Sequence, residues 1–247
     1  TVNRLCGSSL QALAQASHSI LADAEDVQIV GGLEHMHHIP MDAGIDLNPK
    51  LFTRTSKGAL MMGITAEFLA QSQGISREDQ DEFALLSHQK AAAAYTDGAV
   101  DSAAGGFAHE LIPLLGRDEA GNRILVERDQ CVRFDASIEA LAALQPAFMP
   151  GMGTVTAGNS SPLNDGAAAL LVMSEERAKS LGLKPLVKIL ATAVAGVDPA
   201  VMGTGPVPAT QKALQRAGLS LADIDLIELN EAFAAQAIAC IRMLDMD

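Results

Sequence analysis

The sequence predicts a layered α/β protein, and three observations support that fold class. Hydrophobic residues make up 49% of the 247 residues, which is enough for one large or two ordinary domains with real cores. Aromatic residues are only 3% and Trp is absent, so Ala, Leu, Val, Ile and Met must build those cores. Strand-like and helix-like patterns also alternate toward both ends of the chain, which is typical of α/β proteins.

The first elements follow from hydrophobic spacing. Apolar side chains recur with helical period over residues 7–20, and DVQIVGG at residues 26–32 indicates a strand that ends in a glycine turn. The middle of the chain is rich in loops, with a predicted helix over residues 61–73. A second helix begins at Ser76-Arg-Glu-Asp79, where the two end residues form a capping-box pattern, and it runs toward Tyr95.

Regular structure resumes after a stretch dominated by glycine and proline. Residues 146–158 suit a surface loop whose backbone closely approaches another group. The apolar run at residues 165–173 predicts a fully buried strand, and a helix is expected from Ser174, with two glutamates in its first turn. Residues 186–197 resemble another strand.

The C-terminal part repeats the alternation. Residues 208–217 predict a helix closed by a glycine, and residues 224–229 predict a strand. Asn230 then begins a turn into a further helix. We expect the apolar side of that helix, such as Ile238, to lack a covering strand and to be exposed, which favours association.

Charge and cysteine content exclude several classes of protein. The formal net charge of −13 argues against nucleic acid and anionic membranes as partners, because both attract basic surfaces. Three widely separated cysteines make a poor disulfide framework and indicate a reducing compartment. The longest apolar runs, such as residues 167–173, are far shorter than the roughly 20 residues of a membrane span. With no secretory leader evident, we expect a soluble cytoplasmic protein.

Cys6 stands where a strand-like entry meets the start of the first predicted helix. The helix dipole and the unpaired N–H groups at such a position favour thiolate, which is the nucleophilic form of cysteine. The small residues Gly7, Ser8 and Ser9 leave room for a substrate carbonyl. Position alone leaves a second interpretation open, in which Cys6 is a small buried hydrophobic residue.

The segment Cys6-Gly-Ser-Ser resembles the nucleophile segment of the thiolases. Seven further segments resemble that family in the same order along almost the whole chain, and together they are specific where each alone is not. These segments are GGLEHM at residues 31–36, MGITAE at 62–67, PAF at 146–148, GTVTAG at 153–158, NDGAA at 164–168, GTGPVP at 203–208 and NEAF at 230–233. Details of the sequence are most similar to the bacterial thiolases of fatty acid oxidation.

The resemblance implies a thiolase-like layered α/β/α fold of two similar half-domains plus an inserted loop domain. Residues 1–35 and 163–187 are expected to form part of the N-terminal half-domain. Residues 36–162, where the β/α alternation is interrupted, form the predicted insertion. Residues 188–247 form a C-terminal half-domain that is incomplete.

The resemblance also implies an activity and its residues. A thiolase uses a cysteine acyl-enzyme to cleave 3-ketoacyl-CoA thiolytically to acetyl-CoA and a shortened acyl-CoA, here in fatty acid β-oxidation. Cys6 is then the nucleophile, and Asn230 holds a water that stabilises the thioester oxygen, although Asn is also a common helix N-cap. An alternative is the biosynthetic acetoacetyl-CoA thiolase, which uses the same residues in the reverse direction.

Four residues match family positions that bind coenzyme A, which is a substrate here, so no cofactor is expected. Arg133 matches a residue near the nucleotide phosphate, and Ser161 one that hydrogen-bonds pantetheine. Phe148 and Met62 match residues along the pantetheine and acyl path, although ordinary core packing would also explain both. The implied assembly is a homodimer or homotetramer, with the hydratase/dehydrogenase α subunit of the fatty acid oxidation complex as a further partner.

Two motifs of the family do not occur in this sequence. Thiolases carry a Gly-His-Pro motif and a second catalytic Cys-x-Gly motif beyond the helix that follows Asn230, and none of the six histidines lies in a Gly-His-Pro context. The chain therefore resembles an internal fragment of the enzyme. We expect the isolated fragment to be inactive, as an inert piece that binds coenzyme A or has a structural role.

Two further signals do not support a site. His35, His37 and His38 are adjacent ligands that converge poorly on one ion, and no partner has standard spacing, so we expect no metal. The glycines at 203 and 205 do not form a dinucleotide fingerprint, because no G-x-G-x-x-G follows a strand.

Overall fold

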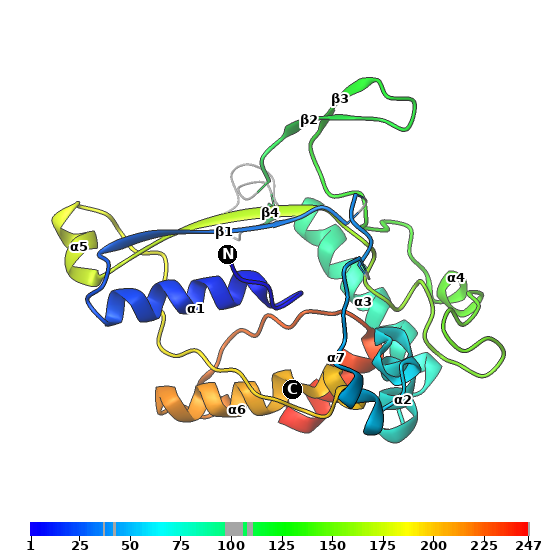
Figure 1. Ribbon diagram of the computed structural model, residues 1–247. Helices are drawn as coiled ribbons and strands as arrows, with labels where there is room; N and C mark the ends of the chain where they lie inside the picture. The colour runs from blue at the N-terminus through cyan, green and yellow to red at the C-terminus, as the bar shows by residue number, and fades with distance from the viewer. Residues whose placement is uncertain (37, 42, 97–105, 108–110, 247) are drawn as a thin grey trace. The chain divides into compact units, whose positions relative to one another are not determined.

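The computed structural model describes the chain apart from residues 37, 42, 97–105, 108–110 and 247 (Figure 1). The α-helices in the described residues are α1 (Ser8–Leu21), α2 (Met62–Ser72), α3 (Arg77–Thr96), α4 (Ile138–Ala142), α5 (Glu175–Ser180), α6 (Pro206–Ala217) and α7 (Ala234–Leu244). The strands are β1 (Val27–Glu34), β2 (Leu114–Arg117), β3 (Arg123–Val126) and β4 (Gly166–Met173). Short 3-10 helices are η1 (Pro49–Thr53), η2 (Gly58–Leu60), η4 (Pro199–Thr204) and η5 (Leu221–Asp223).

Contacts within the chain divide it into two compact units. The first unit comprises Thr1–Asn48, Leu163–Gly196 and Pro208–Leu226. The second comprises Pro49–Pro162, Val197–Val207 and Ile227–Asp247. The division into half-domains and an insertion that the sequence predicts stays a prediction.

A two-stranded antiparallel sheet and one helix form the centre of the first unit. β1 pairs with β4 in a register that runs from Val27 opposite Met173 to Glu34 opposite Gly166. Figure 1 shows α1 lying along one face of this pair of strands, with which it is in contact. The predicted helix at residues 7–20 and the two predicted strands are thus confirmed.

The two faces of this sheet differ in exposure. Val30 is buried, with 7% of its surface exposed, whereas Ile29 and Leu33 on the opposite face are 80% and 82% exposed. Side chains of neighbouring strand residues point to opposite faces, so α1 covers only one of them. The expectation that β4 is fully buried is wrong for this chain, because Leu170 and Leu171 are both more than half exposed.

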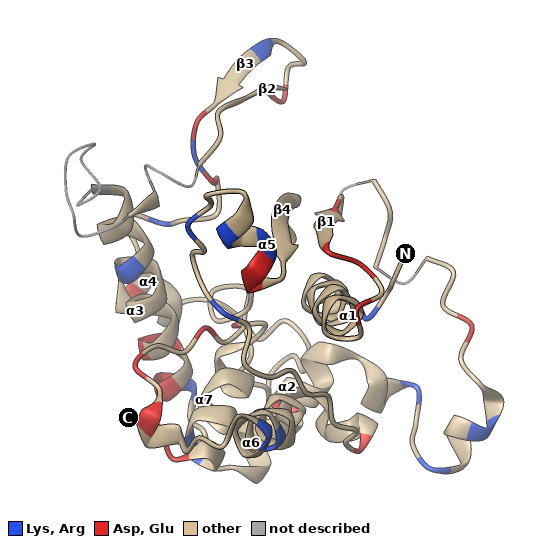
Figure 2. Ribbon diagram, turned by 90° about the vertical axis from the view of Figure 1, so that its left-hand side faces the viewer, with Lys and Arg blue, Asp and Glu red and all other residues tan. Residues whose placement is uncertain are grey.

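The predicted helix after Ser174 is confirmed as α5, and its ends show why it forms. The Ser174 hydroxyl accepts a hydrogen bond from the Arg177 N–H, which satisfies one of the free amides of the first turn. Figure 2 shows acidic and basic residues on this short helix, where Glu175 and Lys179 form an ion pair of 2.6 Å. Such an exposed pair adds little stability.

Two predicted strands are absent from the structure. Residues 186–197 and 224–229 contain no strand, although both are described. A strand forms only where a neighbouring strand hydrogen-bonds to its backbone N–H and C=O groups. In residues 186–197, side chains bond to some of these backbone groups instead. Arg216 and Lys212 of α6 donate to the carbonyl oxygens of Thr192 and Val194, at 2.6 and 3.3 Å.

The second unit is built around α2, α3 and α7. α7 contacts both of the other helices, and the three contribute to a shared core. That core comprises Ala70, Ile75, Ala235, Ile238 and Ala239, with the ring of Phe83 packed against it. Small residues allow these helices to approach closely, as the composition predicts. The expectation that Ile238 is exposed is wrong, because the apolar side of α7 packs against Ala70 of α2 and against Ile75.

The close approach of α1 to β1 makes a test of the first unit. A side chain at Gly32 would collide with Ser9 of α1, whereas one at Gly31 would meet only the carbonyl of Ala168 at 3.9 Å. We expect Gly32→Ala to lower the free energy of unfolding by about 1–3 kcal/mol, because overpacking displaces the helix. Gly31→Ala is the matched control and should cost less, as measured by urea unfolding. Equal losses in the two variants would contradict this packing.

Candidate functional site

The loop of residues 153–161 shapes the candidate site, and a buried carboxylate holds it in place. Val155 and Thr156 are fully buried, so the expectation of a surface loop is wrong for this part of it. Glu67 of α2 accepts hydrogen bonds from the N–H groups of Thr154 and Val155 at 2.9–3.0 Å. A side chain at Gly153 would collide with this carboxylate, which explains the glycine.

A second buried polar group ties the same loop to α3. Asn159 is 2% exposed, and its amide donates to Asp81 at 2.9 Å and to the Thr154 carbonyl at 3.1 Å. Its side-chain oxygen accepts from the Thr156 N–H at 2.8 Å. Asp81 is in turn paired with Arg77 at 2.8 Å, one helical turn earlier. Each of these buried groups therefore has the partner that burial demands.

Arg77 links this network to α4. Its guanidinium also donates to the carbonyl oxygens of Leu141 and Leu144 at 2.7 and 3.0 Å, which lie at and beyond the end of that helix. The Leu141 carbonyl also accepts the Leu144 N–H at 3.0 Å, and a cation at this end of the helix offsets the helix dipole. The start of α3 is itself fixed by the predicted capping box, since Ser76 and Asp79 exchange backbone-to-side-chain bonds at 3.2 and 3.0 Å.

The loop runs beside the segment that leads into α7. The Ser161 N–H donates to the Ala232 carbonyl, and the Ala234 N–H donates to the Asn159 carbonyl, both at 2.9 Å. Ser160 and Phe233 form a β-bridge between these two bonds. Three consecutive residues of the loop therefore fix the position of the segment before α7 relative to the loop.

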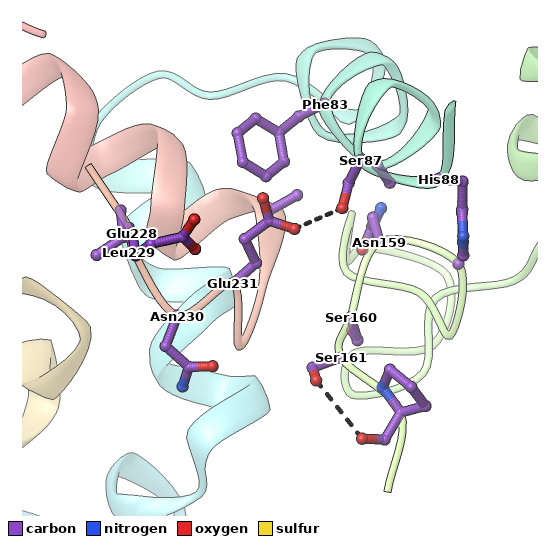
Figure 3. Close-up of a pocket in the computed structure, with 14 residues that line it drawn as sticks. Phe83, Ser87, His88, Asn159, Ser160, Ser161, Glu228, Leu229, Asn230 and Glu231 are labelled. Atoms are coloured by element: carbon purple, nitrogen blue, oxygen red, sulfur yellow. Dashed lines mark hydrogen bonds between the residues drawn. The ribbon is translucent and has the colours of Figure 1, made fainter. Parts of the chain in front are cut away.

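A pocket of about 410 Å³ lies where α3, the loop and this segment meet. Figure 3 shows its lining side chains, which come from α3, from residues 158–162 and from residues 228–234. The polar groups in the lining are Ser87, His88, Asn159, Ser160, Ser161, Glu228, Asn230 and Glu231. Such a mixture suits a polar ligand that is bound by several hydrogen bonds.

Two of these side chains interact across the pocket. The Ser87 hydroxyl donates to the Glu231 carboxylate at 2.6 Å, and Figure 3 shows the two pointing toward each other. The neighbouring His88 accepts the N–H of Arg133 on its Nδ1 at 3.3 Å. Partial burial and then the Arg133 charge lower the pKa of His88, while Glu231 acts in the opposite direction.

The pocket brings together two of the residues that the sequence singles out. Asn230 and Ser161 both line it and come from segments more than sixty residues apart. Asn230 is not the helix N-cap, because α7 begins only after Phe233 in the cap position. The capping alternative for Asn230 is therefore wrong, and its side chain remains available for another role.

The other predicted residues of the second unit do not line this pocket. Arg133 is exposed, and its backbone N–H bonds to His88, which lines the pocket. Phe148 is half-buried, with its ring edge-on to Phe233 at 5.8 Å between centroids, as the packing alternative expects. Met62 is the first residue of α2 and is 39% exposed. The roles of these residues in binding stay predictions.

Cys6 lies in the first unit, immediately before the N-cap of α1. It is exposed, so the alternative of a buried hydrophobic residue is wrong for this structure. Leu5 just before it has φ of 53°, a left-handed conformation that is unfavourable for a non-glycine residue. Hydrogen bonds hold that turn: the Ser8 hydroxyl donates to the Leu5 carbonyl at 2.7 Å, and Asn3 accepts from the Leu5 N–H at 2.9 Å.

The other cysteines have different surroundings. Cys240 is fully buried in α7, where its thiol donates to the Gly203 carbonyl at 3.2 Å. Burial raises the pKa of the Cys240 thiol, and the Gln236 hydrogen bond opposes this shift. A buried thiol of raised pKa is a poor nucleophile. Cys131 is half-buried in a loop that starts no helix.

The histidines near residue 35 form no metal centre in the described part of the chain, where no three candidate ligands converge. His35 instead pairs with Asp165 at 2.9 Å and stacks on His38. His37 lies outside the described residues. None of the described helices combines the length and apolar character that a membrane crossing requires.

Comparison with known proteins defines the family. Residues 1–176 match the N-terminal domain of thiolase, and residues 183–247 match its C-terminal domain. The chain therefore belongs to the thiolase family, and the resemblance noted in its motifs is confirmed.

The relatives of this chain include 3-ketoacyl-CoA thiolases of many bacteria. The chain is 54% identical over 246 residues to that of Aliivibrio fischeri, covering 100% of this chain and 62% of the relative. It is 56% identical over 238 residues to that of Alcanivorax borkumensis, covering 96% of this chain and 59% of the relative. The chain thus spans about 60% of the length of these relatives.

Solved structures show the same fold. An acetyl-CoA acetyltransferase from Bacillus anthracis superposes with a TM-score of 0.84 at 38% identity, covering 100% of this chain and 64% of the other. The enzyme of that name from Syntrophomonas wolfei gives 0.81 at 36% identity, covering 97% and 61%. The predicted thiolase-like α/β fold is confirmed.

Sequence reasoning missed several lining residues of the pocket, namely Ser87, His88 and Glu231. Glu231 stands in the quoted NEAF segment, so its position beside Asn230 was visible. Ser87 and His88 lie in the middle of a predicted helix, and nothing in the local pattern distinguishes them from other polar residues on its surface. Only the folded path of the loop beside α3 shows that they face the pocket.

The buried carboxylate of Glu67 supports a direct test of how the loop is held. Glu67→Gln replaces one acceptor oxygen by a donor that faces backbone N–H groups. We expect the free energy of unfolding to fall by about 1.5–3 kcal/mol, as for a lost hydrogen bond to a charged group. Urea unfolding measures it, with Glu82→Gln on the exposed side of α3 as the control, expected within about 0.5 kcal/mol of the parent. A parent-like Glu67→Gln protein would show that the carboxylate does not hold the loop.

Proposed function

We propose that the protein is a degradative thiolase that cleaves 3-ketoacyl-CoA to acetyl-CoA and a shortened acyl-CoA in fatty acid β-oxidation. The observation that carries the proposal is the exposed Cys6 at the start of α1, within a chain 54% identical to a named 3-ketoacyl-CoA thiolase. Free backbone N–H groups at a helix start favour thiolate and stabilise nearby negative charge. The fold itself does not select the reaction, since folds host many functions.

The reaction in this proposal has two halves. The Cys6 thiolate attacks the 3-keto carbon, the bond between C2 and C3 breaks, and its electron pair leaves on acetyl-CoA as an enolate that takes up a proton. A new coenzyme A thiol then loses its proton and takes the acyl group, which returns Cys6 as thiolate. Sulfur suits both halves because it is a good nucleophile and a good leaving group.

In this proposal the second unit supplies groups for binding and charge stabilisation. Asn230 holds a water that stabilises the thioester oxygen, and Ser161 hydrogen-bonds pantetheine. Arg133 interacts with the nucleotide phosphate, and Phe148 and Met62 border the acyl path. The placement of Asn230 and Ser161 on one pocket supports the first two roles.

The assembly is also part of the proposal. The protein acts in the cytoplasm as a homodimer or homotetramer, together with the hydratase/dehydrogenase α subunit of the fatty acid oxidation complex. Since this sequence has neither the Gly-His-Pro nor the Cys-x-Gly motif, the 247 residues by themselves are proposed to bind coenzyme A without turnover. A thiolysis assay on this chain alone checks that point, and measurable turnover would contradict it.

The nucleophile is tested by replacing Cys6 in the full natural protein that carries this sequence. Cys6→Ala should lower kcat by about 10³-fold or more, because it removes the proposed nucleophile. Cys131→Ala is the control and should retain activity. Iodoacetamide should modify Cys6 faster than Cys240, and acyl-CoA should slow that labelling. Full activity of Cys6→Ala would refute the assignment.

A second candidate is the biosynthetic direction, which the names of the solved acetyl-CoA acetyltransferases favour. Measurements of kcat/KM for 3-ketoacyl-CoA substrates of increasing chain length distinguish the degradative from the biosynthetic enzyme. For a degradative enzyme we expect kcat/KM to be higher for medium and long chains than for acetoacetyl-CoA, because added methylenes gain apolar contact. Activity confined to acetoacetyl-CoA would support the biosynthetic enzyme instead.

A further inference from the structure

Two consecutive residues of α3 hold two different segments of the second unit. Ser87 donates to Glu231, which is the neighbour of Asn230. His88 accepts from the backbone of Arg133. One turn of one helix thus contacts both the segment proposed to stabilise the thioester and the segment proposed to meet the nucleotide phosphate.

The contact to Arg133 sets the chemical state of His88. A backbone N–H can only donate, so Nδ1 must carry a lone pair and the ring proton must lie on Nε2. Protonation of the ring would place a hydrogen on Nδ1, facing the Arg133 N–H, and the bond would be lost. The contact therefore exists only with neutral His88.

Charged groups on the neighbouring segments act on this ring. Partial burial disfavours the charged ring most, the Arg133 charge adds to this effect, and Glu231 acts in the opposite direction. Glu228 also lines the pocket, whereas residues 158–162 bring no charge to it. The net effect lowers the pKa of His88 below its ordinary value of about 6.5. The contact is therefore maintained at neutral pH and is lost only as the pH falls through that lowered pKa.

We propose that His88 is a positioning residue for coenzyme A: its Nδ1 holds the backbone of Arg133 so that the guanidinium meets the nucleotide phosphate, and protonation of the ring releases that segment. This inference rests on the proposed function. Because Ser87 holds the Asn230 side through a separate bond, loss of the His88 contact weakens binding of coenzyme A and leaves the chemical step nearly unchanged. The predicted signature is a change in KM without a matching change in kcat.

The test compares two substitutions in the full natural protein. His88→Ala removes the acceptor, whereas His88→Asn keeps an acceptor oxygen near the position of Nδ1 and cannot be protonated. Gln89→Ala, on an exposed residue of the same helix turn, is the control. Three quantities are measured between pH 5.5 and 8: the dissociation constant of coenzyme A, KM and kcat for a 3-ketoacyl-CoA, and hydrogen exchange of the peptide that contains the Arg133 amide.

We expect His88→Ala to raise the dissociation constant and KM by about threefold to tenfold at neutral pH, the effect of one hydrogen bond. Exchange at Arg133 should become faster, and kcat should stay within about twofold. His88→Asn should match the parent at neutral pH, but without the parent's loss of affinity on acidification.

Two outcomes would overturn the proposal. In one, His88→Ala leaves coenzyme A affinity and Arg133 exchange like the parent. In the other, His88→Asn is as impaired as His88→Ala, so that the acceptor is not the cause. If the parent protein binds coenzyme A but shows no thiolysis, the proposed function is wrong. The role of His88 is still decided in that case by the dissociation constant of coenzyme A and by hydrogen exchange at Arg133.

Discussion

The carboxylate of Glu67 is the group on which the candidate pocket most depends. The loop it binds has no regular structure, yet part of it is fully buried, so its backbone N–H groups need partners from side chains. A buried charge is itself costly unless donors surround it. Glu67 and the loop amides thus satisfy each other, and without that exchange neither could stay inside the unit.

A chain of hydrogen bonds connects Glu67 with the segments that carry Ser161 and Asn230. Glu67 fixes Thr154 and Val155, and Asn159 then folds the loop back through its bonds to Asp81 and to the loop's own backbone. The following residues bond to the segment before α7. The position of a proposed catalytic asparagine is therefore determined by polar groups on α2 and α3, Glu67 and Asp81, that do not line the pocket.

The sequence predicted those parts of the fold whose cause is local. The helix at residues 7–20, the capping box at Ser76 and the strand at 26–32 each follow from spacing or from a side chain that caps its own backbone. The predictions that failed concern elements that depend on a partner elsewhere in the chain. Residues 186–197 have the composition of a strand, but a strand exists only where a neighbour pairs with it, and α6 supplies side chains there instead.

The candidate site shows the same limit. Motif order identified Asn230 and Ser161 and the family to which they belong. No local pattern identified Ser87 or His88, because their role depends on which segments cross α3. The predicted residues also fall in both units, with Cys6 in one and the rest in the other.

Arg77 has an effect beyond its ion pair with Asp81. The five-residue α4 is far too short to persist as an isolated helix in water. Its terminal carbonyls are bound by the same guanidinium that pairs with Asp81, and through Asp81 with Asn159 of the loop. Opening of α4 would therefore leave the buried Asp81 without part of its support, so the helix and the loop belong to one cooperative unit of local unfolding. A peripheral turn of helix thereby takes its stability from the interior of the molecule.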